Sequence, residues 1–222
     1  MRTALVSLIA LSALATSVAA QAPTAAPPTA APATEPPATA AAAPAATPPV
    51  TPPAPQEPAP PPPTLPTTGD GAVVLQVLQN VCVPSVKANG GLDARAKAAG
   101  MKKGKNGAWV LALGGAKDYT ITVQPQGSNR NVCQSEVRYA IGAEKPIISA
   151  LNVYAFLHDP EMPLQRNDYT VDATNKRITL SWEHYTDKES TGLVLVQLKN
   201  PDGTPLNARY DTATLLYSER TF

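Results

Sequence analysis

The chain has little charge of either sign. Charged residues make up 16% of its 222 positions, and the formal net charge at pH 7 is +1. Residues 69–222 hold 17 Lys and Arg residues against 15 Asp and Glu residues. The strong positive field that typifies nucleic-acid-binding domains is therefore absent, and we expect no nucleic-acid partner.

Motifs of common catalytic sites are also missing. The two histidines, His158 and His184, occur in neither an HExxH nor an HxH arrangement. The stretch GSNRN at 127–131 is not a GxSxG nucleophile elbow, and GMKKGKNG at 100–107 lacks the phosphate-binding pattern GxxxxGK[ST]. We therefore assign no catalytic residue, no cofactor and no metal ligand.

An enzymatic alternative stays open around the two histidines. His158 is followed by Asp159 and Glu161, and His184 is preceded by Glu183. Such groups could pair a base with a carboxylate, or ligate zinc, in a hydrolase of the cell envelope. A simpler role for His158 is to cap the end of a helix, where the helix dipole favours a positive charge.

Cysteine is scarce as well, since Cys82 and Cys133 are the only two. Neither belongs to a CxxC redox motif, and the paired close spacings of thiolate zinc sites are absent. Cys82 lies on the apolar side of an expected helix, and Cys133 lies on the inward face of an expected strand. We predict a disulfide between them, which would stabilise the fold by about 4 kcal/mol by closing a loop of ~50 residues.

The apolar run at the start of the chain, residues 4–15, is shorter than the ~20 residues that span a bilayer. One charge at Arg2 precedes this run, and the small residues Val18 and Ala20 follow it. The pattern predicts a secretory signal peptide at 1–20, with an uncleaved anchor as the alternative. After cleavage we expect no membrane span.

Residues 21–68 contain almost no side chain that could build a core. Pro, Ala and Thr fill 42 of these 48 positions. Such a segment stays solvated and largely extended, and at ~3.1 Å per residue its reach approaches ~150 Å. We interpret it as a disordered spacer through a cell-wall or envelope layer, with a solubilising tail as the alternative.

Residues 69–222 have the length of a single globular domain. Pro84 is expected to end a first helix, and Pro146 fits the first turn of a later one. Apolar residues at helical spacing predict three helices, at about 72–83, at 92–99 and within 145–160.

Apolar runs and alternating patterns predict strands in the same region. The clearest is VCQSEVRYAI at 132–141, in which one face carries Cys133, Ser135, Val137, Tyr139 and Ile141. Further strands are expected at 108–113, at 119–123, in a hairpin at 168–185, at 192–199 and at 212–219. The prediction is an α+β domain, with a mainly antiparallel sheet of about five to seven strands and two or three helices on one side.

Two surface segments could bind a ligand. The loop QPQGSNRN at 124–131 gathers Gln126, Asn129 and Arg130, whose side chains can hydrogen-bond sugars or peptide backbones. Lys102 and Lys103 belong to a basic cluster that could meet an anionic envelope polymer or a lipid head group. An ordinary turn and a solvated surface are the corresponding alternatives.

Three aromatic residues have two interpretations. Trp109, Trp182 and Tyr185 could form a surface on which a glycan stacks. Core packing is the default expectation for both tryptophans.

These features favour a protein that is exported to the periplasm or secreted. The expected function is that of a non-catalytic binding or interaction protein of the cell envelope, with a globular domain presented on a long spacer. Its expected partner is another envelope protein or a cell-wall polymer. Besides the hydrolase, a self-associating structural surface component is the remaining alternative.

Overall fold

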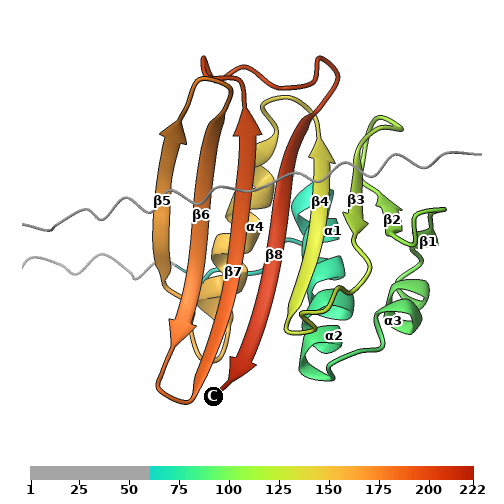
Figure 1. Cartoon of the computed structure of the whole chain (residues 1–222), viewed down its shortest axis with the longest axis vertical. Coiled ribbons are helices and arrows are strands. Elements are labelled where there is room, and N and C mark those ends of the chain that lie inside the picture. The colour runs from blue at the N-terminus through green and yellow to red at the C-terminus, as the bar shows by residue number, and fades with distance from the viewer. Residues whose placement is uncertain (1–60) are drawn as a thin grey trace, which may run out of the picture. The chain divides into compact units, whose positions relative to one another are not determined.

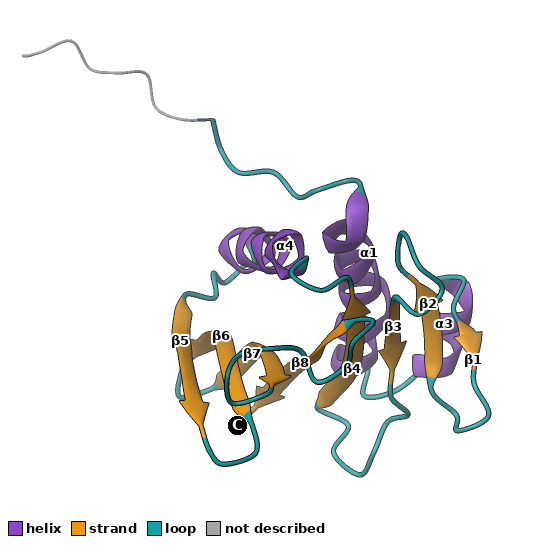
Figure 2. Ribbon diagram, turned by 90° about the horizontal axis from the view of Figure 1, so that it is seen from above, coloured by secondary structure: helices purple, strands orange, loops and turns teal. Residues whose placement is uncertain are grey.

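Eight antiparallel strands form one sheet in the part of the chain that this computed structural model describes, residues 61–222 (Figure 1). These residues belong to one compact unit, and the helices at 69–87 and 144–157 lie on one face of the sheet (Figure 2). The predicted α+β class is therefore confirmed. The predicted signal peptide at 1–20 and the first part of the predicted spacer, 21–60, lie outside the described residues.

The strands follow the sheet order β1-β2-β3-β4-β8-β7-β6-β5, and every neighbouring pair is antiparallel. The last strand of the chain, β8, lies between β4 and β7, so it joins the two halves of the sheet (Figure 1). The strand bounds are β1 (Lys102–Lys103), β2 (Trp109–Ala112), β3 (Thr120–Val123), β4 (Val132–Tyr139), β5 (Leu164–Val171), β6 (Lys176–Tyr185), β7 (Glu189–Lys199) and β8 (Asp211–Thr221).

The strand count exceeds the expected five to seven by one. The strand that the sequence did not indicate is β1, where Lys102 pairs with Val110 and Lys103 pairs with Trp109 of β2. Two lysines in a glycine-rich segment show no apolar alternation, so this strand exists only because β2 supplies a partner. The basic segment that contains both lysines is thus partly a strand rather than wholly a loop.

The first helix extends past Pro84, and the prediction that it would end there is wrong. It consists of α1 (Gly69–Val77), a π-helical segment η1 (Leu78–Cys82) and α2 (Val83–Lys87), which follow one another without a break. Pro84 lies in the first turn after the π-helical segment. Hydrogen bonds in a π-helical segment join residues five apart, so the regular ladder of bonds four apart, which a proline would interrupt, is already displaced just before Pro84.

The two remaining helices agree with the sequence prediction. They are α3 (Leu92–Ala98) and α4 (Glu144–Leu157), and Pro146 lies in the first turn of α4. The side of α4 that faces the core is made of Ile147, Ala150, Leu151, Tyr154 and Ala155. No helix within residues 61–222 is both long enough and apolar enough to cross a bilayer.

The core lies between these helices and the inner face of the sheet. On β4, the predicted inward residues Cys133, Ser135, Val137 and Tyr139 are buried. The fifth, Ile141, is 49% exposed, so its predicted place in the core is wrong. The strand ends at Tyr139, and Ile141 lies in the turn that leads to α4.

No helix within residues 61–222 covers the outer face of the sheet (Figure 2). The predicted hairpin at 168–185 is present as β5 and β6, although β5 already begins at Leu164. Leu180 and Trp182 of β6 point toward the core, as the alternation predicted, and Trp182 Nε1 donates to Asn152 Oδ1 of α4 at 2.9 Å. This bond fixes α4 over the β6 side of the sheet.

Candidate ligand-binding site

A disulfide fastens the first helix to the sheet next to the candidate site. It joins Cys82 of η1 to Cys133 of β4, with an S–S distance of 2.04 Å and a Cα–Cα distance of 5.3 Å. The bond fits an oxidising compartment, because disulfides persist where thiols are not kept reduced. It also holds α2 close to the end of β4 that follows the loop at 124–131.

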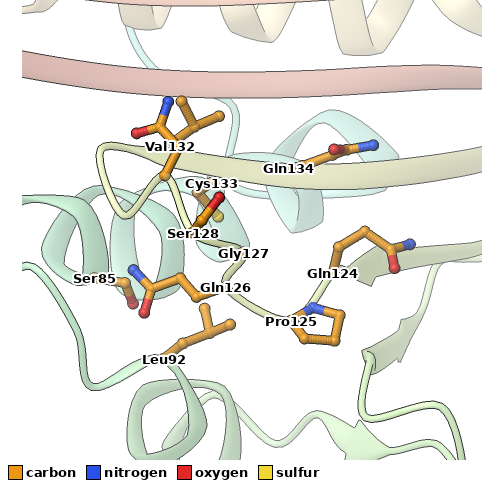
Figure 3. A pocket seen from close by; sticks show the side chains of 11 residues that line it. Ser85, Leu92, Gln124, Pro125, Gln126, Gly127, Ser128, Val132, Cys133 and Gln134 are labelled. Atoms are coloured by element: carbon orange, nitrogen blue, oxygen red, sulfur yellow. The ribbon is translucent and has the colours of Figure 1, made fainter.

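A pocket of about 340 Å³ lies between that loop and the helices α2 and α3 (Figure 3). Its sides combine distant parts of the sequence: Ser85 comes from α2, Leu92 from α3, and Cys133 from β4. Figure 3 shows Ser85, Leu92 and Gln126 around the same space. The loop therefore forms one wall of a pocket whose opposite wall is helical.

Every residue that lines the pocket is uncharged. Its polar side chains are four amides and two hydroxyls, from Gln124, Gln126, Asn129, Gln134, Ser85 and Ser128. Each amide offers both donors and acceptors, and the Ser128 hydroxyl can do either, whereas the buried Ser85 hydroxyl already donates to the Val81 carbonyl oxygen. Such a lining suits a neutral, hydroxyl-rich or amide-rich ligand, and it supplies no countercharge for an ion.

Short hydrogen bonds within the loop hold its shape. Asn129 Oδ1 accepts a bond from the Asn131 N–H at 3.1 Å, and Gln126 Nε2 lies 3.4 Å from the Arg130 carbonyl oxygen. The first contact is the side-chain-to-backbone bond that is typical of Asn in turns. It uses only the oxygen of Asn129, so the NH₂ group of the same side chain is not engaged in it.

The predicted ligand residues do not all meet at the pocket. Gln126 and Asn129 line it, whereas Arg130 Nη1 donates to the Asn89 carbonyl oxygen at 3.4 Å and is not part of the lining. Lys103 borders a neighbouring depression of about 400 Å³, which shares Gln126 and two other residues with the pocket. Lys102 is exposed on β1 and lines neither.

An ion pair that the sequence did not indicate holds Lys103. Its Nζ lies 2.6 Å from Asp93 Oδ2 and 5.3 Å from the centre of the Trp109 ring. Asp93 also accepts a hydrogen bond from Trp109 Nε1 at 2.8 Å. The hydrogen bonds from Lys103 and Trp109 lower the pKa of the Asp93 carboxyl below its ordinary value near 3.8. The sequence contains only one weak indication of this ion pair: Asp93 lies in the first turn of a short helix that precedes a cluster of lysines.

The two histidines lie in separate environments. His158 Nδ1 is 2.7 Å from the Pro160 carbonyl oxygen, and its ring packs edge-on against Tyr154. It stands at the C-terminal end of α4, but it bonds the following loop instead of a carbonyl of the helix. His184 lies on β6, with Nε2 at 3.8 Å from Glu189 Oε1 of β7. Within residues 61–222, no three side chains of His, Cys, Asp or Glu come together as a metal site.

The aromatic residues divide between core and surface. Trp109 and Trp182 are buried, so core packing is the correct interpretation for both. Tyr185 is exposed and tilts against the ring of Phe222, with 5.9 Å between the ring centres. The three residues therefore do not form one stacking surface.

Sequence reasoning found the loop but missed the helical wall of the pocket. Ser85 and Leu92 are not distinctive in the sequence, because a small polar residue and a leucine are ordinary in helices. The predicted disulfide could have placed this helical wall. Ser85 follows Cys82 by three residues, so pairing Cys82 with Cys133 brings Ser85 to the loop that precedes Cys133. The chain matches no known protein-family model, and it has no significant match among curated proteins or solved structures.

Proposed function

We propose that this chain is an exported, non-catalytic binding protein of the cell envelope, and that the pocket beside the disulfide takes a neutral segment of a cell-wall polymer. The observation that carries the proposal is the uncharged lining of amides and hydroxyls on a loop clamped to the helices. Sugar hydroxyls and acetamido groups are matched by such donors and acceptors.

The size of the pocket, and the residues that it shares with a neighbouring depression, favour a polymer over an isolated small molecule. A volume of about 340 Å³ is at the small end of ligand sites and accommodates only a short stretch of a chain-like ligand. The neighbouring depression shares Leu92, Pro125 and Gln126 with the pocket, so a longer ligand can continue from one into the other. There it meets Lys103 and Asp93, which pair with each other.

Three features support the proposed compartment, the periplasm or the exterior. They are the disulfide, the signal-like sequence at 1–20, and the Pro/Ala/Thr-rich composition of 21–68, which suits a spacer. Such a spacer would separate the domain from whatever its N-terminal end contacts.

The proposal is tested by co-sedimentation of the purified exported chain with insoluble cell-wall polymer. Wild type is expected to sediment with the polymer. Gln126→Ala removes an amide shared by both depressions, and the loss of one hydrogen bond, ~1 kcal/mol, weakens binding about fivefold. Gln76→Ala on α1 is the matched control, because it removes an exposed amide that lines neither depression and lies outside β5.

Two results would contradict the proposal. One is a wild-type chain that stays in solution although circular dichroism shows it folded. The other is equal binding by the Gln126→Ala and Gln76→Ala variants. Capture of a single envelope protein by crosslinking, without wall polymer, would instead assign the protein a proteinaceous partner.

A further inference from the structure

The two edge strands of the sheet differ in length. The edge strand β1 has only two residues, whereas β5 at the other edge has eight. All eight residues of β5 are exposed, including the large apolar side chains Leu164, Tyr169 and Val171. Among residues 61–222 the strand pairs with β6 alone, so its N–H and C=O groups that point away from β6 have no strand partner in this part of the chain.

The charges on β5 are arranged so that the strand is complementary to itself. Arg166 and Asp168 flank Asn167 on the same face, and Arg166 Nη2 lies 3.0 Å from Asp168 Oδ2. In an antiparallel pair of β5 strands with Asn167 opposite its own copy, each Arg166 faces the Asp168 of the other chain. One twofold axis thus creates two attractive cross-strand pairs.

The two adjacent registers lack this match. A pair centred on Asp168 would place two aspartates opposite each other, and one centred on Arg166 would do the same with two arginines. Like charges directly opposite each other destabilise a strand pair. The charge pattern therefore disfavours a slip of the pair to either adjacent register.

We propose that two copies of this chain associate through β5, with Asn167 on the twofold axis, so that their sheets join into one. The bulge between Leu164 and Arg166 interrupts the regular ladder, so with Asn167 on the axis only residues 166–168 of each chain pair regularly. An interface of one short strand pair is small, so we expect a weak dimer with a dissociation constant of roughly 10–100 µM. The two charge pairs then carry much of its specificity.

The test is sedimentation equilibrium of the full purified chain over about 10–500 µM. Wild type is expected to shift from monomer to dimer in this range. Arg166→Asp and Asp168→Arg each place like charges opposite each other in the proposed register. Each variant alone is expected to raise the dissociation constant about tenfold or more.

An equimolar mixture of the two variants provides the decisive measurement. In the proposed register, the two acidic side chains of one variant face the two basic side chains of the other, so a heterodimer is expected to form with near-wild-type affinity. Misfolding of either variant could not produce that recovery. A wild-type chain that stays monomeric at 500 µM, single variants that dimerise like wild type, or a mixture that stays monomeric would each overturn the proposal.

Discussion

At the scale of single residues, one ion pair differs from the others because it is buried. Lys199 Nζ lies 3.0 Å from Asp211 Oδ2, and the two side chains are only 13% and 1% exposed. Asp211 Oδ1 has no hydrogen-bond partner, so the lysine is the main group that compensates this carboxylate. Removing one partner of a buried pair leaves an uncompensated charge, which is more costly than losing an exposed pair.

We predict that Lys199→Met lowers the free energy of unfolding by about 3 kcal/mol. Lys87→Met is the matched control, because Lys87 pairs with Glu219 at 3.8 Å on the surface and its loss should cost under about 1 kcal/mol. Urea denaturation followed by circular dichroism measures both. Equal losses in the two variants would show that the burial of the Lys199 pair is unimportant.

Acid sensitivity is a second property of single residues. In the turn between β5 and β6, Asp172 Oδ1 accepts hydrogen bonds from the Thr174 hydroxyl, the Thr174 N–H and the Asn175 N–H. These bonds, the one from the Thr174 hydroxyl first, lower the pKa of Asp172 below its ordinary value near 3.8. A carboxyl with a lowered folded-state pKa contributes stability above its unfolded pKa, and this stability is lost as the pH falls through the folded value.

We therefore expect the melting temperature to fall as the pH drops below about 4, where unfolded aspartates begin to bind protons. Asp172→Asn keeps the oxygen acceptor but cannot titrate, so its melting temperature should depend less on pH below that value. Thermal melts from pH 5 to pH 2 make the comparison. Parallel curves for the two proteins would exclude a contribution of Asp172 to acid denaturation.

At the scale of elements, the disulfide is the covalent link between the first helix and the sheet. Its ends are 51 residues apart in the chain, and in the chain-entropy model a loop of that length contributes about 4 kcal/mol. We predict that the double variant Cys82→Ala/Cys133→Ala loses up to that amount in urea denaturation. Alkylation of the native wild type, followed by intact mass measurement, should label no thiol before reduction and two afterwards. Two labelled thiols in the unreduced protein would refute the link.

The same elements show what the sequence could predict. Alternation identified β4, the β5–β6 hairpin and the buried side of α4, because each shows its period within one segment. It failed at β1 and at the helix around Pro84, where a neighbouring strand and a π-helical turn decide the local structure. At the candidate site, Gln126 and Asn129 were found from local composition. The ion pair of Lys103 with Asp93 depends on tertiary packing, so no local pattern shows it.

At the scale of the whole molecule, the proposed functions use different parts of the sheet. The pocket lies at the loop between β3 and β4, and the proposed dimer contact lies at β5, with β8, β7 and β6 between them. Association through β5 therefore leaves the pocket open on each copy. Two pockets on one particle would allow both to engage a repetitive polymer, which strengthens binding without any new contact.

The central position of β8 has a consequence for the order in which the sheet can form. Within residues 61–222, β4 and β7 do not pair with each other, and each pairs with the strand from Asp211 to Thr221. β1 to β4 and β5 to β7 are each built from pairings between strands that are consecutive in the chain, whereas the pairing of β4 with β8 closes a long stretch of chain. Because the entropy of closing a long loop is lost before the new contacts repay it, we expect the union of the two halves to be the slow step of folding.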